Sequence, residues 1–139
     1  MRTVLIPVDG SPQSTMAVAT LLRFADYERI GQVCLLNVQP ELHPGYRALD
    51  AAEIAALTLQ QGERALIDGV RLLEEAGIPF QIRIETGAVA PTIARVAEET
   101  GAEQIFMGSQ GRGAIAAFVL GSVAIKTLSL TSLPITLVR

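Results

Sequence analysis

Glycines gather at two points in the last third of the sequence, where they could bind a phosphate chain. The candidates are Gly108, Gly111, Arg112 and Gly113 in the first segment and Gly121, Ser122 and Val123 in the second. Residues without a β-carbon let the backbone approach an anion closely, and consecutive N–H groups in such a loop form a concave anion site. If the chain turns back between the segments, the Ser122 hydroxyl and nearby N–H groups face one pocket, beside the positive end of a helix dipole.

Two common phosphate motifs do not describe this stretch. Residues 111–116 fit a dinucleotide fingerprint ending in alanine, but they follow the fourth apolar run and lack an acidic residue about 20 positions on. A Walker motif fails because Lys126-Thr127 follows Ile125 instead of a glycine. The stretch is therefore not an ordinary P-loop.

Five short β-type runs must position these residues. Each is bounded by Gly, Pro or Asp, and most are apolar on successive residues, which is typical of strands covered on both faces by helices. The runs are residues 3–8, 32–38, 80–85, 104–107 and 135–138. The run 80–85 alternates in polarity, which predicts an edge strand.

Four helical stretches separate the runs. The first begins at Ser11-Pro12, a capping residue and a proline tolerated at the first helical position. Its apolar spacing predicts a buried face of Met16, Thr20, Leu21, Phe24 and Ala25. The second, about 50–76, places Leu59, Leu66, Val70 and Leu73 on one stripe before Gly77. The others are predicted at about 89–100, ending before Gly101, and about 115–130.

The alternation of strands and helices predicts an α/β fold: a doubly wound, five-stranded parallel sheet with helices on both faces. A chain of 139 residues, half of them hydrophobic, suits one core, so residues 1–139 are expected to form a single domain. Ligands of such sheets bind beyond the carboxyl ends of the strands, where the strand order reverses. The loops after the first and fourth strands are therefore the expected site.

The glycine pattern resembles the nucleotide motif of the universal stress protein family, in its ATP-binding branch. The pattern is Gly108-x-x-Gly111, nine further residues, then Gly121-Ser122. The resemblance extends over the whole chain: residues 4–11 look like the family's opening strand and turn, 35–38 like its second strand and 134–138 like its closing strand. It implies a Rossmann-like fold of the adenine nucleotide alpha hydrolase type.

The resemblance also implies roles for individual residues. Asp9 should contact the adenosine part, and Val38 should border adenine through its backbone. Gly108 and Gly111 should shape the ribose and phosphate loop, which continues through Gly113, while Gly121, Ser122 and Val123 should cradle the phosphates. The implied ligand is ATP, or AMP or ADP, with Mg or Mn bound through the phosphates.

Two positions depart from the family pattern. Gln110 stands where the family usually has Arg or His, which removes a phosphate cation and leaves Arg112 as the candidate substitute. Gln104 replaces an apolar residue of the fourth strand. The first departure puts nucleotide affinity, not the fold, in question.

Structural interpretations of the same residues stay open. The glycines could serve only turns and close packing. Asp9 could order the turn that follows it, and Ser122 could cap a helix. Arg112 could be a solvated surface residue.

The remaining chemistry-bearing residues suggest no catalytic centre. Cys34 lies in an apolar run and is predicted to be buried. His43 has no second histidine or neighbouring cysteine to build a zinc site or triad, and is predicted to lie on the surface. Glu74-Glu75 and Glu98-Glu99 are expected on solvated helix faces.

Composition narrows the partners and the compartment. Eleven Lys+Arg against fourteen Asp+Glu give a net charge of −3, with a pI near 5.1, which argues against nucleic acid as a partner. The longest apolar stretch is broken at Gly121 and is too short to span a bilayer, so no direct membrane insertion is expected. One cysteine suits a reducing, cytoplasmic location.

The leading hypothesis is a cytoplasmic ATP-binding stress-response protein whose nucleotide controls conformation and partner binding, with little or no hydrolysis. The alternatives are a nucleotide hydrolase or transferase using the same cleft, and a scaffold without nucleotide that regulates a transporter or another partner. The apolar last run, 135–138, would form an open sheet edge, which predicts a homodimer through it, with a higher oligomer as a further option.

Overall fold

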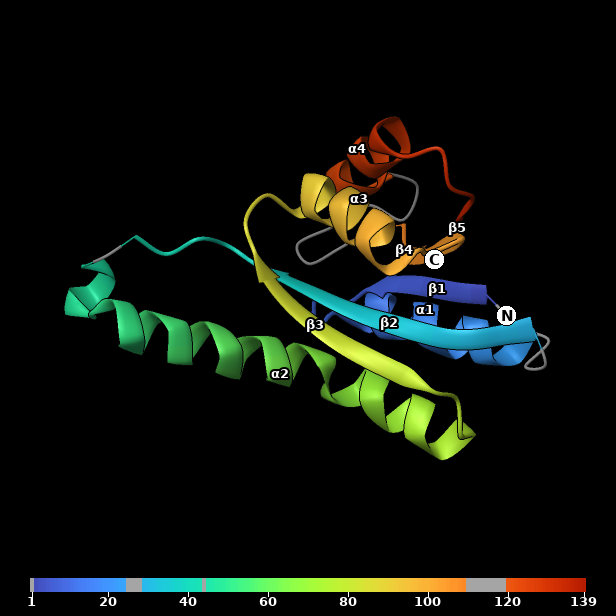
Figure 1. Ribbon diagram of the computed structural model, residues 1–139, viewed down its shortest axis with the longest axis horizontal. Coiled ribbons are helices and arrows are strands. Elements are labelled where there is room, and N and C mark those ends of the chain that lie inside the picture. Colours follow the sequence, from blue (N-terminus) through green and yellow to red (C-terminus); the bar gives the residue numbers. More distant parts are fainter. Residues whose placement is uncertain (1, 25–28, 44, 110–119) are drawn as a thin grey trace.

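A computed structural model of the chain describes residues 2–24, 29–43, 45–109 and 120–139. A five-stranded parallel sheet forms its centre (Figure 1). The strands are β1 (Arg2–Pro7), β2 (Ile30–Gln39), β3 (Phe80–Thr86), β4 (Gln104–Gly108) and β5 (Ile135–Val138). The helices are α1 (Pro12–Phe24), α2 (Ala51–Ala76), α3 (Val89–Thr100) and α4 (Ser122–Leu130), with a short 3₁₀ turn at Tyr46–Ala48.

The strand order is β3-β2-β1-β4-β5, and every neighbouring pair is parallel. The chain winds from β1 outward through β2 to β3, then returns to the other side of β1 and continues through β4 to β5. The order therefore reverses between β1 and β4, which confirms the predicted doubly wound fold. β3 is an edge strand, as its alternating polarity predicted.

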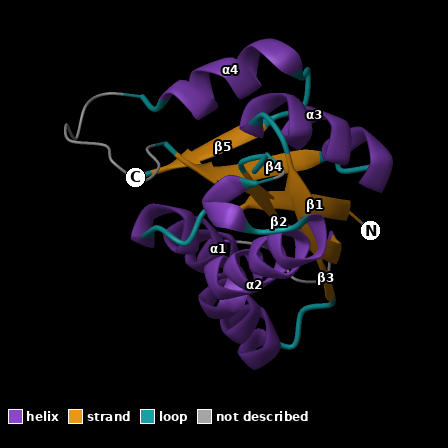
Figure 2. Cartoon of the chain, turned by 90° about the vertical axis from the view of Figure 1, so that its left-hand side faces the viewer, coloured by secondary structure: helices purple, strands orange, loops and turns teal. Residues whose placement is uncertain are grey.

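Each face of the sheet has its own core. Alternate residues of β1 point to opposite faces: Ile6 packs with Val18 and Leu66 under α1 and α2, whereas Leu5 packs with Ile93 on the α3 side. Figures 1 and 2 show α1 and α2 on one face and α3 and α4 on the other. Fully burying one such aliphatic side chain stabilises the fold by roughly 1.5–3 kcal/mol. The two cores therefore hold the sheet rigidly, and the loops at the strand ends are anchored to it.

The ends of α2 follow their sequence signals. Asp50 and Glu53 form a reciprocal capping box, in which the Glu53 N–H donates to Asp50 Oδ1 at 2.8 Å. The helix ends at Gly77, whose φ of 70° is a left-handed conformation that glycine adopts without strain. The predicted helix 50–76 and the predicted stop are both confirmed.

The predicted buried face of α1 was wrong in part: Leu21 is buried as predicted, Met16 and Phe24 are not, and Ala25 lies outside the described residues. Met16 is 47% exposed and Phe24 is 74% exposed, whereas the buried residues of α1 are Ser14, Ala17, Val18 and Leu21. The buried face of α1 therefore combines the small Ser14 and Ala17 with Val18 and Leu21, and it is rotated from the face that the apolar spacing predicted. Leu59 of α2 is likewise exposed, while Leu66 and Leu73 are buried as predicted.

The predicted start of the last helix was also wrong. The helix begins at Ser122, because Gly121 has an extended conformation (φ −61°, ψ 150°) and Leu120 is not helical either. Residues 115–119 of the predicted helix lie outside the described residues. Within the described residues, no helix is both long enough and apolar enough to cross a membrane.

Candidate functional site

The turn after β1 is ordered by the side chain of Asp9. Its Oδ1 accepts a hydrogen bond of 2.8 Å from the Ser11 N–H, and the Asp9 N–H donates to Ser14 Oγ at 3.3 Å. Gly10 between them has a φ of 85°, which favours glycine. The interpretation of Asp9 as a turn-ordering residue is therefore confirmed, and a contact with a nucleotide would be an additional role.

Ser11 is the N-terminal cap of α1. Its Oγ accepts a hydrogen bond from the Ser14 N–H at 3.2 Å, and its carbonyl accepts one from the Thr15 N–H at 3.2 Å. This confirms the predicted start at Ser11-Pro12. The first turn of α1 therefore begins directly after the end of β1. Asp9 lies between the two, at the carboxyl edge of the sheet.

A buried amide that sequence reasoning missed ties β1 to β2. Asn37 is 2% exposed, and its Nδ2 donates to the Val8 carbonyl at 2.8 Å. Gln39 Nε2 in turn donates to Asn37 Oδ1 at 2.7 Å. The available signal was the polar residue itself, because an amide inside the apolar run 33–38 needs a partner when it is buried. The pair fixes the backbone immediately before Asp9.

Described residues from the two glycine segments lie next to each other. The Ser109 N–H donates to the Val138 carbonyl at 2.8 Å, and the Gly121 N–H donates to the Ser109 carbonyl at 2.6 Å. Gly108 and Ser109 therefore lie beside Gly121 and Ser122, as the glycine spacing predicted. Gln110, Gly111, Arg112 and Gly113 lie outside the described residues.

The amino end of α4 presents backbone N–H groups without a side-chain cap. Gly121 is the N-cap, and the first bond within the helix runs from the Ile125 N–H to the Gly121 carbonyl at 3.0 Å. Ser122 is exposed and is the first helical residue, so the interpretation of its hydroxyl as the cap was wrong. The N–H groups of Ser122, Val123 and Ala124 precede the first helical hydrogen bond, and such groups bind anions.

Val38 lies on the same face of the sheet as the start of α4. Val38, Leu120 and Val123 all pack against the buried cluster that contains Leu36 and Met107. The described candidates thus come from the ends of β1, β2 and β4 and from the start of α4. These strand ends lie at the carboxyl edge of the sheet, and the strand order reverses there between β1 and β4, which is the usual ligand position in an open parallel sheet.

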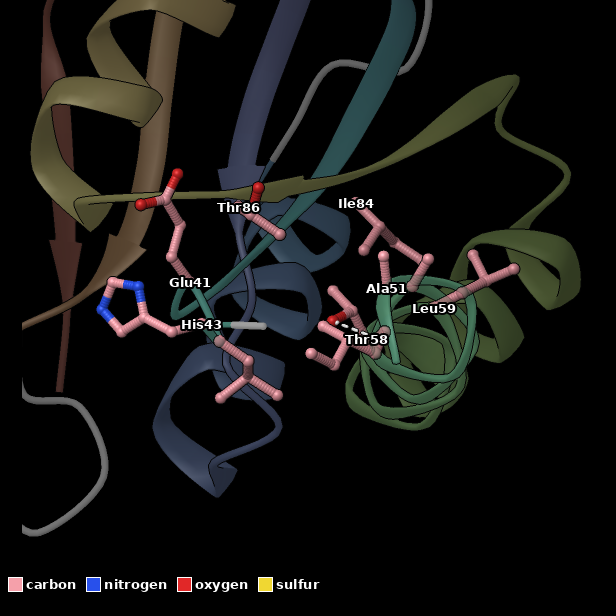
Figure 3. Close-up of a pocket in the computed structure, with 10 residues that line it drawn as sticks. Glu41, His43, Ala51, Thr58, Leu59, Ile84 and Thr86 are labelled. Carbon is pink, nitrogen blue, oxygen red and sulfur yellow. Dashed lines mark hydrogen bonds between the residues drawn. The ribbon is translucent and has the colours of Figure 1, made fainter. Parts of the chain in front are cut away.

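A cavity of about 550 Å³ lies near the end of β3 (Figure 3). Its apolar wall comes mainly from Ile54 and Leu59 of α2 and Ile84 of β3. Figure 3 shows the side chains of Glu41 and His43 directed away from α2.

His43 is exposed, as predicted. The described residues contain no group of three or more His, Cys, Asp or Glu side chains placed to hold a metal ion.

Four charged side chains form a ring between β3 and α3. Arg83 bonds Glu85 at 3.0 Å and Glu99 at 2.7 Å, and Arg95 bonds the same two carboxylates at 2.9 and 2.7 Å. Hydrogen bonds from Arg95 and Arg83 lower the pKa of Glu99. Glu99, expected on a solvated helix face, is thus part of an ion-pair network at the edge of the sheet.

Comparison with known proteins gives matches over the whole chain. The profile of the Universal stress protein family matches residues 1–139. Universal stress protein MJ0531 of Methanocaldococcus jannaschii is 28% identical over 142 residues, which cover 99% of this chain and 82% of that protein. Universal stress protein Sll1654 of Synechocystis is 27% identical, over 99% of this chain and 85% of that protein.

Solved structures show the same fold. The hypothetical protein MJ0577 superposes with a TM-score of 0.80 at 24% identity, over 99% of this chain and 94% of that chain. A universal stress protein in complex with cAMP has a TM-score of 0.74 at 21% identity, with 99% and 97% of the two chains covered.

A further neighbour is the Arabidopsis thaliana family protein with AMP bound, with a TM-score of 0.70 at 16% identity over 99% and 90% of the chains. Another is the Archaeoglobus fulgidus protein in complex with dAMP, with a TM-score of 0.67 at 16% identity over 100% and 98%. The parallel five-stranded sheet and the profile match agree. The chain belongs to the universal stress protein family.

Proposed function

We propose that this protein binds ATP as a single-domain, cytoplasmic stress-response regulator, and that the bound nucleotide controls its conformation and its contacts with partners. The observation that carries the proposal is the hydrogen bond between the Gly121 N–H and the Ser109 carbonyl. This bond supports the proposal because it joins Ser109, which follows Gly108, to Gly121 at the carboxyl end of β4.

The phosphate end of the proposed ligand lies at the amino end of α4. Uncapped N–H groups and the helix dipole favour a polyanion there, and the exposed Ser122 hydroxyl can donate one more hydrogen bond. In this proposal Gly108, Gly111, Arg112 and Gly113 complete the loop around the phosphates. Mg or Mn would be held mainly by phosphate oxygens and water, as is usual for magnesium in nucleotide sites.

The adenosine end lies toward β1 and β2, with Asp9 and Val38 as its proposed contacts. Support comes from structural neighbours of the same fold that were solved with cAMP, AMP and dAMP, all of them adenine nucleotides. ATP rather than a monophosphate is proposed because the α4 N-terminus adds anion-binding N–H groups beyond the strand ends. AMP and ADP are the competing ligands.

We expect little hydrolysis, because the proposed site offers a cradle of backbone N–H groups and no residue assigned as a base to activate water. Binding energy is then available to shift a conformational equilibrium, which requires the nucleotide to bind one state more tightly than the other. The partner that reads this state is proposed to be a regulatory protein, with a membrane transporter as one candidate.

The proposed assembly is a homodimer through β5. This strand is the last in the sheet order, so one of its edges is open among the described strands. Helix α1 contacts β5, and its Met16 is exposed, as are Ile125 and Leu128 of α4. Two-fold pairing of β5 strands would provide partners for the main-chain groups at the open edge.

Calorimetric titration of nucleotide-free protein with Mg·ATP, Mg·ADP and AMP tests the proposal. Saturable heat with ATP is expected, and it should weaken several-fold in Ser122→Ala but remain unchanged in Ser129→Ala, a matched serine at the far end of the same helix. Purified protein should hold ATP for hours without turnover. Absence of heat and of thermal stabilisation at millimolar nucleotide would overturn the proposal.

A further inference from the structure

The outer side of α2 carries a regular stripe of residues. Six positions recur at intervals of four and three residues, which is the spacing of a coiled-coil seam. They are Ala56, Gln60, Glu63, Ile67, Val70 and Glu74, and we call this set the α2 seam. All of them except Val70 are exposed. Figure 1 shows α2 along the margin of the molecule, with the sheet on one side of it.

The middle of the α2 seam is apolar and adjoins the edge of the sheet. Ile67 is 58% exposed, and Ile82 of the edge strand β3 is 46% exposed. Together with Leu66 and Val70 they line a hollow of about 300 Å³ between the helix and the strand. Large apolar side chains gathered beside a free sheet edge mark a surface that a partner covers.

Acidic side chains bracket this apolar surface. Glu63 and Glu74 are 11 residues apart, about three helical turns, so they lie on the same side of α2. Within the described residues neither carboxylate takes part in an ion pair. Arg71 also lines the hollow, but it pairs with Asp68 at 3.4 Å, and the α2 seam itself contains no lysine or arginine.

The negative charge of this surface indicates which kind of partner would bind there. A second copy of the chain would bring Glu63 and Glu74 onto the same surface with one arginine, Arg71, which already pairs with Asp68, so carboxylates outnumber cations and like charges repel across the interface. An anionic lipid surface is disfavoured for the same reason. A helix with apolar residues at heptad spacing and lysines or arginines beside them complements both the hollow and the two carboxylates.

We propose that the α2 seam, together with Ile82, is a docking surface for a basic amphipathic helix of a partner protein. The surface lies on the α1 and α2 face of the sheet, whereas α4 with its proposed phosphate site lies on the other face (Figure 2). The inference names the chemistry of a partner that the proposed function leaves unspecified. Its test uses no nucleotide, so its failure and a failure of nucleotide binding can be told apart.

The experiment measures binding of the whole chain to a fluorescein-labelled synthetic helix by fluorescence anisotropy. The probe is about three heptads long, with leucines at seam spacing and lysines on both flanks. Saturable micromolar binding is expected. Glu63→Lys, Glu74→Lys and Ile67→Glu should each weaken it by about tenfold or more, because each removes a complementary contact or places like charges together. Glu75→Lys and Glu98→Lys change the net charge equally outside the seam and should stay within about twofold of the parent.

A charge-reversed probe, with glutamates in place of lysines, should bind the double variant Glu63→Lys, Glu74→Lys better than it binds the parent. This rescue shows that a variant which lost the first probe is still folded. The proposal is overturned if a scrambled lysine peptide binds equally well, if Glu75→Lys weakens binding as much as Glu63→Lys, or if the probe fails to bind. It is also overturned if sedimentation shows that Ile67→Glu splits an assembly of the parent chain, since the surface then belongs to a second copy.

Discussion

The main-chain N–H of Gly121 donates a 2.6 Å hydrogen bond to the carbonyl oxygen of Ser109. This bond joins the end of β4 to the cap of α4, and the Ser109 N–H joins the same point to β5. Three elements therefore fix the place where the proposed phosphates lie. A site built from main-chain groups in this way depends on the space around them more than on any single side chain.

Gly121→Val should abolish high-affinity ATP binding while the fold is kept. The backbone of Gly121 (φ −61°, ψ 150°) is open to any residue, so no strain is expected. The added branched side chain at the helix cap would occupy the space proposed for phosphate. Titration calorimetry should show a loss of about tenfold or more in affinity, and Gly121→Ala a smaller loss. Unchanged affinity in the valine variant would rule out phosphate binding at this cap.

Asn37→Leu should destabilise the protein and also weaken nucleotide binding. The variant keeps the number and branching of the side-chain heavy atoms but leaves the Val8 carbonyl without its 2.8 Å donor. Loss of a partner to a buried polar group costs about 1–3 kcal/mol, which urea denaturation would measure. Gln39→Leu, which removes only the outer member of the pair, should cost less. If the two variants lower the free energy of unfolding equally, the hydrogen bond to the Val8 carbonyl is not the main stabilising contact of Asn37.

Most of the fold could be predicted from the sequence because the buried strands are short and continuously apolar. Runs such as residues 33–36 and their glycine and proline boundaries leave little choice beyond a parallel sheet between helix layers. The rotation of α1 could not be predicted, because the small residues Ser14 and Ala17 are buried while the larger Met16 and Phe24 are exposed. The spacing of apolar residues within one helix does not show which of its faces packs on the sheet.

The candidate site could be predicted in part. The sequence offered the proximity of the two glycine segments as a condition for a phosphate pocket, and the bond between Ser109 and Gly121 meets that condition. The contact between Asn37 and Val8 was missed, because these residues are 29 positions apart in the sequence. Asp9 shows a different limit. A residue that orders a turn and a residue that contacts a ligand carry the same sequence signal, and the 2.8 Å bond to Ser11 establishes only the first role.

Gly62→Ala should destabilise the fold although alanine favours helices. A β-carbon at Gly62 would lie 2.5 Å from Ile84 Cγ2 and 2.9 Å from Cδ1. The overpacking cost of about 1–3 kcal/mol exceeds the gain of up to about 1 kcal/mol in helix propensity. Urea denaturation of Gly62→Ala, Ile84→Ala and the double variant should show that the double variant loses less than the sum. Gly69→Ala, whose nearest contact is 3.3 Å, is the milder control.

Cys34 should be inert toward thiol reagents in the native protein. Burial raises the pKa of its thiol from 9.0 to about 11, so the thiolate is scarce at neutral pH. Ellman's reagent should react with the unfolded chain only. The raised pKa also means that the contribution of this thiol to stability is complete below pH 9.0 and is lost as pH rises toward about 11. Cys34→Ala should lack that part of the alkaline loss, and fast native labelling at pH 7 would contradict the assignment.

Leu137→Pro should convert the proposed dimer into a monomer. The Ile105 N–H donates to the Pro134 carbonyl and the Ser109 N–H to the Val138 carbonyl, so in this parallel ladder the main-chain groups of Leu137 point to the open edge. Proline removes the edge N–H that a partner β5 would use without removing a bond to β4. Leu137→Ala is the matched control, because it truncates the same side chain but keeps the N–H. Sedimentation at micromolar concentration should give a dimer for the parent and the alanine variant and a monomer for the proline variant. A monomeric parent, or a proline variant that stays dimeric, would place the contact between copies elsewhere.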